Sequence, residues 1–443
     1  MVHIKWCWIS LWSVLLLGGC ASMEAWKHPA PAQDYAHRVA QVRETLHTEG
    51  TEAALEMVIR HTETAYTSRA HPIHQGELPL WWRERASLEA MLGRHRDAAH
   101  NFDVAWKLLD ERQIAAGGRK RPLLHSNWQL YGPSALAFVP PTHEDMLLPL
   151  LAASSRLAAS DHQGAQVELR RFEGARQYQR SVDPEGLMGL EGLSWWAARI
   201  LERTGDHQRM WLHEKEAKRP LSDPARPAPV VVLVHYGDGP RKEMQSLPAS
   251  LGVEMVRTFE VPKRLQAFRG PRPAEMLGMA KRYSHLWFIE GSQTLGFNFT
   301  APVLTTSKSD CEPELKVDGE PVAPEAFVGL GMVASRAWLD DRRMTVGISF
   351  LDAMARRGSE NTTPVNCERN PGYCGLDSRH WGMLPGAFYG YAVSPEAKQL
   401  EMVECGRSTT VALRGDGSEG VIQLWSRGTQ PKPVVLPAME IVE

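Results

Sequence analysis

A proline-rich segment divides the chain into two parts whose apolar residues repeat with different periods. Residues 219–229 read RPLSDPARPAP, and because proline fixes φ and lacks a backbone N–H, this run favours a linker. Before it, apolar residues recur at helical spacing; after it, β-branched runs and turn residues prevail. The 443 residues leave room for more than one domain. We predict an α+β protein, with a helical-repeat domain over 34–219, a linker over 220–229 and a β-rich domain with helical insertions over 230–443.

The first residues have the pattern of an export signal. The apolar run Trp6–Leu17 is too short to span a membrane as a mature helix and has the length of a signal sequence. It leads into Gly18-Gly19-Cys20, which resembles the end of a bacterial lipoprotein signal, where the cysteine is lipidated and becomes the first residue. We predict a lipoprotein signal peptide over 1–19, lipidation at Cys20 and an unstructured tether over 20–33. An ordinary secretory signal with an incidental cysteine is the alternative.

The predicted lipid anchor also implies a location. In lipoprotein signals of this kind, an Asp directly after the cysteine tends to retain the protein in the inner membrane, whereas here Ala21 and Ser22 follow. The resemblance therefore implies the periplasmic face of the outer membrane. The lipid bilayer becomes the first expected partner, because more than one acyl chain is enough for stable anchoring.

A repeat signature lies within the helical part. The segment 82–105 reads Trp-x3-Ala-x6-Gly-x4-Ala-x3-Phe-x2-Ala, which looks like the tetratricopeptide (TPR) pattern, in which small residues let two antiparallel helices approach. Weaker echoes near Gly50, Asp161 and Gly205 are irregularly spaced, so the repeats are degenerate. An irregular helical bundle without a binding role is the alternative. The residues expected to pack the repeat helices together are Trp82, Ala86, Gly93, Ala98, Phe102 and Ala105.

The second half contains short strand patterns. The run Val230–Tyr236 ends in a Gly-Asp-Gly-Pro turn, and Asp318-Gly319 is typical of a tight hairpin. A helix is expected over 325–357. Three further strands, expected to form a meander, cover 399–405, 409–414 and 421–426.

The cysteine count fits an exported protein. Of six cysteines, Cys7 lies in the signal and Cys20 is the lipidation site, which leaves four in the second half. An even number in an oxidising compartment favours disulfides. The turn residues 370–372 favour a Cys367–Cys374 pair, and this leaves Cys311–Cys405. A four-cysteine zinc site is the alternative, although the paired C-x₂-C spacing is missing.

The sequence contains no recognisable set of catalytic residues. The net charge of -2 provides no long-range field for nucleic acid, so no nucleic-acid partner is expected. No phosphate-binding loop, H-E-x-x-H or dinucleotide fingerprint occurs. The segment 229–239 resembles the strand and oxyanion turn of an α/β-hydrolase, with Ser292 or His235 as the reacting residue, but no G-x-S-x-G elbow follows. We predict a non-enzyme without cofactor or metal, and hydrolysis is a lesser alternative.

Several patches resemble a family of bacterial TPR-bearing outer-membrane lipoproteins of unknown function. They are the repeat at 82–105, the stretch 141–171 with Glu144 before a helix, and the strand and turn at 230–243. The fourth patch, 376–385, looks like the motif Asp-x-Arg-x-Trp-x-x-Leu-Pro of the family. Its residues in this chain are Asp377, Arg379, Trp381, Leu384 and Pro385.

The motif residues also have a structural interpretation. Asp377 and Arg379 are able to pair, and Trp381 is expected to anchor the segment in the core of the β-rich domain. The resemblance implies location and architecture but no activity. We therefore expect a non-enzymatic scaffold that binds a periplasmic or outer-membrane protein. The alternative is a module that binds a small envelope ligand, such as a wall fragment or polysaccharide, at the junction of the two halves. The oligomeric state stays open.

Overall fold

The computed structural model combines helices and sheets in one α+β fold. It describes residues 33, 35–117, 138, 140–182, 184–220, 229–258, 298–306, 311–357, 379–415, 421–426 and 434–436. The predicted signal peptide, Cys20, almost all of the tether and most of the linker lie outside this part of the chain. Within the described ranges, none of the helices combines the length and the apolar character needed to cross a membrane.

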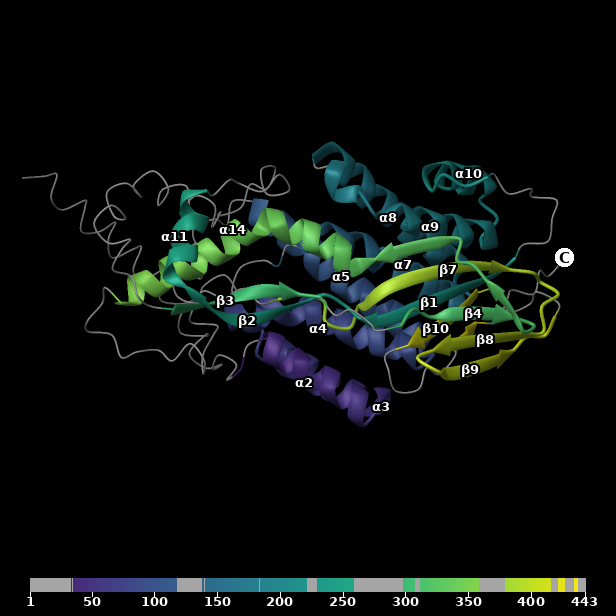
Figure 1. Ribbon diagram of the computed structural model, residues 1–443, viewed down its shortest axis with the longest axis horizontal. Helices are drawn as coiled ribbons and strands as arrows, with labels where there is room; N and C mark the ends of the chain where they lie inside the picture. The colour runs from purple at the N-terminus through teal and green to yellow at the C-terminus, as the bar shows by residue number, and fades with distance from the viewer. Residues whose placement is uncertain are drawn as a thin grey trace, which may run out of the picture.

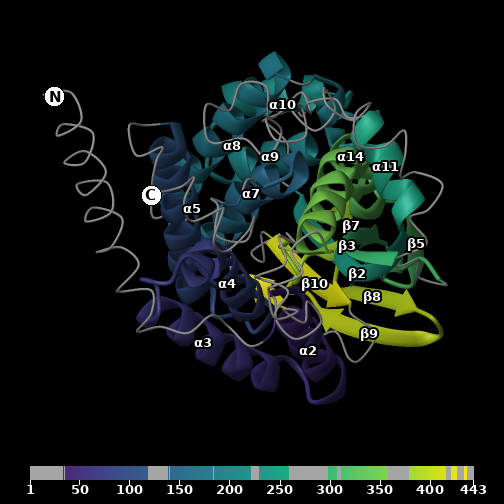
Figure 2. The ribbon, with the colours of Figure 1, turned by 90° about the vertical axis from the view of Figure 1, so that its left-hand side faces the viewer.

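The described part of the first half is helical, as the apolar spacing predicts, and short turns join several of the helices. Figure 2 shows them in an arc, with the strands of the second half on its inner side. In chain order they are α2 (Tyr35–Thr48), α3 (Thr51–Thr67), α4 (Pro72–Met91), α5 (His95–Gly117), α7 (Thr142–Ala158), α8 (His162–Val182), the 3-10 turn η2 (Pro184–Leu187), α9 (Glu191–Arg203) and α10 (His207–Glu216).

The α4–α5 pair shows why this sequence forms helical hairpins. Gly93, in the turn between the helices, has φ +75°, a conformation that L side chains rarely adopt. Ala86 on α4 and Ala98 on α5 are completely buried, and their small side chains let the two helices pack closely. Phe102 fills the space beside them and is also buried.

A five-stranded sheet forms the centre of the second half (Figure 1). Its order is β11-β10-β1-β7-β6, with β1 parallel to β10 and antiparallel to β7. A two-stranded sheet pairs β2 with β3, and a four-stranded sheet has the order β5-β4-β8-β9. The strands are β1 (Val230–Asp238), β2 (Arg241–Pro248), β3 (Asn298–Thr305), β4 (Glu314–Val317), β5 (Glu320–Val322), β6 (Ala326–Gly329), β7 (Pro385–Val393), β8 (Gln399–Glu404), β9 (Arg407–Ala412), β10 (Val421–Ser426) and β11 (Val434–Leu436).

Strand β1 is apolar throughout because both of its faces are buried. Val231 and Leu233 pack into the core that the helices form, whereas Val232 and Val234 pack toward Leu400 and the four-stranded sheet. The central sheet therefore lies between the helical half and the four-stranded sheet. One continuous apolar core joins the helices to the central sheet.

Two tight hairpins organise the four-stranded sheet. Asp318 and Gly319 both have positive φ, 51° and 90°, between β4 and β5, where the sequence predicts a hairpin. Cys405 and Gly406, with φ 47° and 76°, form the turn between β8 and β9. A disulfide joins Cys405 to Cys311, across 94 residues and a Cα–Cα distance of 5.6 Å. This is the pair that the cysteine arithmetic leaves once Cys367 and Cys374 are joined.

The predicted three-stranded meander is wrong in its last strand. β8 and β9 pair with each other, but β10 leaves them and pairs in parallel with β1 in the central sheet. Every residue of β10 is buried, and the interior position between β1 and β11 explains why. Alternation of apolar residues reports that a strand exists but not which strand it pairs with.

The expected helix over 325–357 begins later than predicted. Residues 326–329 form β6, at the edge of the central sheet, and α14 (Leu330–Arg357) follows. α14 packs with β3 and α11 (Ala249–Arg257) around a smaller apolar core that includes Phe299 and Phe350. These elements extend from one end of the central sheet (Figure 1).

Candidate functional site

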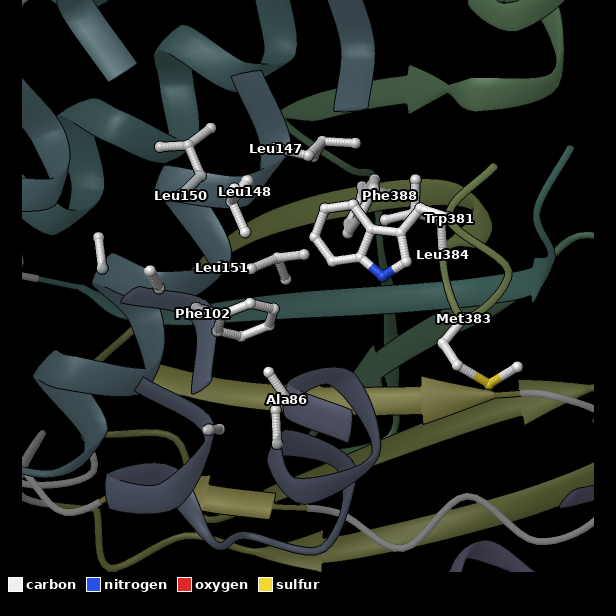
Figure 3. Packing of buried hydrophobic residues seen from close by; sticks show 14 of the residues in the cluster. Ala86, Phe102, Leu147, Leu148, Leu150, Leu151, Trp381, Met383, Leu384 and Phe388 are labelled. Atoms are coloured by element: carbon white, nitrogen blue, oxygen red, sulfur yellow. The ribbon is translucent and has the colours of Figure 1, made fainter. Parts of the chain in front are cut away.

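The motif segment of the second half inserts into the helical half. Residues 379–384 precede β7, and Trp381 is 1% exposed. Its indole N–H donates to Ser87 Oγ on α4 at 3.1 Å, and its ring centroid lies 6.0 Å from that of Phe102 on α5. Figure 3 shows the indole among Leu147, Leu148 and Leu151 of α7, with Phe388 of β7 behind it. The inner face of the helical arc is therefore filled by the chain's own residues.

Two helix carboxylates bind three successive backbone N–H groups of this segment. Glu144 on α7 accepts from Trp381 N at 3.0 Å. Glu84 on α4 accepts from Gly382 N at 2.6 Å and from Met383 N at 2.7 Å. Backbone donors bonded to carboxylates in the interior fix both the position and the direction of a segment. We call residues 379–384 together with Tyr35, Arg83, Glu84, Ser87 and Glu144 the clasp.

Each buried carboxylate of the clasp also has a side-chain partner. Arg83 Nη1 lies 2.8 Å from Glu144 Oε2, and the Arg83 guanidinium carbon is 5.0 Å from the Trp381 ring centroid. The Tyr35 hydroxyl donates to Glu84 at 2.5 Å. These contacts tie α2, α4 and α7 to one segment of the second half.

Burial governs the electrostatics of the clasp. It raises the pKa of Glu84 to about 7, although the hydrogen bonds from Tyr35, Gly382 and Met383 oppose the shift. Burial also raises the pKa of Glu144, against the attraction of Arg83. The pKa of Tyr35 is raised by burial and by the charge of Glu84. The clasp therefore retains a titratable carboxyl close to neutral pH.

Gly382 is required by close packing. A Cβ at this position would lie 2.0 Å from Val39 Cγ1 of α2 and 3.3 Å from Glu84 Oε1. No side chain fits there unless the Val39 side chain or the segment moves. Only glycine lets the backbone approach both helices.

The structure corrects the expected role of Trp381. The sequence placed this side chain in the core of the β-rich domain, but its contacts are with α4, α5 and α7 of the helical half. Arg379, 2% exposed, donates to the Gly76 carbonyl at 3.3 Å. Its expected partner Asp377 lies outside the described residues. Leu384 is buried, and Pro385 begins β7.

A cleft of about 750 Å³ lies where α2 meets β1, β2 and β3. Clefts of this size are typical of sites for small ligands. His380, in the clasp segment, is one of the residues that line it, and its ring lies 6.2 Å from that of Tyr35, edge to face. The clasp thus fixes one side of the cleft. We call this cavity the junction cleft, because both halves of the chain line it.

The junction cleft carries charges of both signs. Arg43 Nη2 on α2 lies 3.1 Å from Asp238 Oδ2 at the end of β1, and His47 Nε2 lies 3.4 Å from Asp238 Oδ1. Arg241 pairs with Glu243 on β2, and the Thr305 hydroxyl donates to Glu243 at 3.1 Å. The remaining charged or titratable side chains of the lining are His37, Glu44, Lys242 and His380.

The predicted repeat-packing residues have different degrees of burial. Ala86, Ala98, Phe102 and Ala105 are buried, whereas Trp82 is partly exposed and its neighbour Trp81 is completely buried. Glu89 stands where the repeat pattern has a tyrosine. It is buried and is bound by Arg85 at 2.8 Å and by Asn101 at 2.6 Å.

Four of the predicted residues fall outside the described part of the chain. They are Cys20, Cys367, Cys374 and Asp377. The hydrolase candidate Ser292 also lies outside it. His235 is completely buried, with its ring stacked on Trp425 at 3.7 Å and close to Trp196 and Phe388. Among the described residues, no cluster of three or more histidine, cysteine or acidic side chains is arranged to hold a metal ion.

Apart from Glu144 and Arg379, the charged residues of the clasp and the cleft were not predicted from the sequence. Glu77 and Glu84 are seven residues apart on α4, on the same face as Trp81, so two carboxylates share a helix face with a large aromatic. Glu77 is buried beside Arg38 at 2.5 Å. Acidic residues on an apolar helix face were the available signal, because such residues are rarely buried without partners. Arg43 has no comparable signal in the sequence.

Comparisons with known proteins add no function to this geometry. No family model, curated protein or solved structure matches the chain.

Proposed function

We propose that the protein is a non-enzymatic binding module of the cell envelope, anchored in the outer membrane through a lipid on Cys20, with the junction cleft as its ligand site. The cleft is the single observation that carries this proposal, because it is lined by both halves and by charged side chains from α2, β1 and β2. The helical half is proposed to be TPR-like. Its inner face holds the clasp segment, which leaves the cleft as the candidate site for a ligand.

A scaffold that binds a periplasmic or outer-membrane protein is the second candidate. One observation favours it: the outer helices carry large apolar side chains with substantial exposure, including Leu212 at 58% on α10 and Tyr178 at 52% on α8. Where such side chains form a contiguous patch, they mark a protein-binding face. In this case the partner would bind the outside of the arc.

Photo-crosslinking in the producing cell distinguishes the two candidates. A photoreactive residue replaces Ser246, which lines the cleft, or Gln245, the exposed neighbour on the other face of β2, which serves as the matched control. A third probe replaces Leu212. A small adduct at position 246 that is missing at position 245 supports the binding module. A dominant protein adduct at position 212, with none at position 246, replaces it with the scaffold.

The anchor is tested separately. Cys20→Ser is expected to abolish incorporation of labelled fatty acid and to release the protein from the membrane fraction. Retention of label in this variant would contradict the lipid anchor without bearing on the cleft.

A further inference from the structure

The junction cleft contains a buried guanidinium, that of Arg43, two of whose nitrogens have no hydrogen-bond partner within the described part of the chain. The Arg43 side chain is 6% exposed and lines the cleft. It lies in ion-pair range of Asp238, yet neither Nη1 nor Nη2 has a hydrogen-bond partner of good geometry among the described residues. A guanidinium presents N–H donors in a fixed fork, so this one has donors available for a further acceptor.

The acceptor that suits these donors is an oxyanion. Carboxylate and phosphate groups match the fork of a guanidinium with two parallel hydrogen bonds, and the pairing is strongest where water is excluded. Asp238, at 23% side-chain exposure, offsets part of the Arg43 charge from one side. A neutral ligand would leave the remaining N–H groups without a charged acceptor.

The other cations of the cleft support the same ligand chemistry. Lys242 on β2 lines the cavity, and its charge opposes, after larger contributions from Arg83 and Trp381, the rise in the pKa of Glu144 that burial causes. Of the three carboxylates in the lining, Asp238 and Glu243 are already paired with cations of the cleft, and Glu44 is exposed on α2. The lining therefore combines two arginines and a lysine with three carboxylates and three histidines around a cavity of about 750 Å³, and Arg43 is the buried cation among them.

We infer that the junction cleft is an oxyanion site, in which Arg43 binds a carboxylate or phosphate group of the ligand and Lys242 contributes a second positive charge. This inference rests on the proposed binding function and specifies its ligand. The oxyanion has two possible sources, the free carboxylate of a peptide or the phosphate ester of a lipid headgroup.

Binding of four small probes to the full chain, purified in detergent, tests the inference and separates the two sources. The probes are alanylalanine, its C-terminal amide, glycerol 3-phosphate and glycerol, followed by ligand-observed NMR. One of the two acids is expected to bind, and its counterpart without the anionic group is not. Binding of alanylalanine assigns the site to a peptide carboxylate, and binding of glycerol 3-phosphate assigns it to a phosphate ester.

Variants locate the binding in the cleft. Arg43→Gln is expected to weaken the acid by about tenfold or more, because hydrogen bonds to a charged group are lost. Arg43→Lys keeps the charge without the fork and is expected to recover part of the affinity. Arg94→Gln is the matched control. It removes an exposed arginine paired with Glu52 on another surface, and unchanged affinity is expected.

Each of three outcomes would overturn the inference. The first is that neither acid binds, and the second is that the amide or glycerol binds as well as its acid. The third is that both Arg43 variants keep full affinity. If Arg43→Gln fails to fold, Lys242→Gln and a salt series on the unaltered protein decide, since affinity for an oxyanion must fall as salt rises. If a small adduct forms at position 246 but neither acid binds, the proposed function stands and the oxyanion inference is wrong. If no adduct forms and neither acid binds, the proposed function and the inference are both wrong.

Discussion

The clasp and the junction cleft are adjacent and both rich in charge, but only the charged groups of the cleft line a cavity. In the clasp, Glu84 and Glu144 take up three successive backbone N–H groups as well as Tyr35 and Arg83. In the cleft, Arg43 is almost as deeply buried, and its Nη atoms have no hydrogen-bond partner among the described residues. Two nitrogens of Arg83 also lack a partner among these residues, but Arg83 does not line the cavity. The two regions share the segment 379–384, which provides Trp381 to one and His380 to the other.

This difference predicts which residues maintain the fold and which are available to bind a ligand. Buried polar groups that bond to the backbone and side chains of the protein itself specify one arrangement of the chain, and removal of any member leaves its partners unsatisfied. Buried polar groups that line a cavity and retain free capacity are instead suited to an outside ligand. Substitutions in the clasp are therefore expected to lower stability, and substitutions in the cleft are expected to change binding.

The largest expected effect is on Trp381. Trp381→Ala removes a buried indole and its hydrogen bond to Ser87, and we expect the free energy of unfolding to fall by about 4 kcal/mol. Denaturant unfolding followed by circular dichroism measures the change. Leu212→Ala, at an exposed position on α10, is the control and should cost under about 1 kcal/mol. Equal losses in both variants would contradict the central role of the clasp.

The next effect concerns the buried ion pair. Glu144→Gln leaves the Arg83 guanidinium, which is 0% exposed, without its charged partner, so we expect a loss of about 3 kcal/mol. The matched control is Glu52→Gln, which breaks the exposed pair with Arg94 and should cost about 0.5 kcal/mol. The same denaturant series measures both variants. Similar costs for the two pairs would mean that the Arg83 charge is satisfied in another way.

A smaller effect is the pH dependence that Glu84 introduces. Its pKa in the folded protein is about 7, raised by burial from 4.5, so the folded state holds a proton that the unfolded state has lost. Stability therefore falls as pH rises between these two values, by on the order of 1 kcal/mol per pH unit from this group. Unfolding measured at pH 5, 6 and 7 gives the slope. Glu84→Gln is expected to flatten it, and an unchanged slope in that variant would assign the dependence to another group.

The smallest expected effect on stability is at the cleft, and it tests whether the cleft lining is dispensable for folding. Lys242→Gln alters a partly exposed residue of the cleft lining, and we expect the free energy of unfolding to change by only about 0.5 kcal/mol. Thermal unfolding of the variant beside the unaltered protein measures this. A loss comparable to that of Glu144→Gln would show that the cleft is part of the structural core.

Local features of the fold could be predicted from the sequence. The run Val230–Tyr236 indicates β1, and the Asp318-Gly319 pair indicates the β4–β5 hairpin, because strand propensity and turn conformation depend on neighbouring residues. The resemblance of residues 82–105 to a repeat pattern predicts Ala86 and Ala98 as packing positions, and both are buried. Each of these predictions uses information within a few residues of the position concerned.

Contacts between distant segments could not be predicted. Trp381 bonds to Ser87 across 294 residues, and nothing near either residue specifies the other. The same reason explains why β10 was assigned to a meander, since its partner β1 lies far back in the chain. The cleft depends on α2, β1 and β2 meeting, so Arg43 becomes a candidate only after the elements are assembled in space.

The pairing of β1 with β10 has a consequence for the order in which the chain folds. β1 is an inner strand of the central sheet, and Val231 pairs with Val421 near the other end of the sequence. Glu84 likewise receives its backbone partner from a residue 298 positions later. Contacts of such long sequence separation form slowly, because the loop between them must close first. The helices are synthesised first, so the inner face that carries Glu84 and Glu144 stays uncovered until the last strands have been made. A chain that is truncated before residue 379 has an incomplete core, and we expect proteases to degrade it.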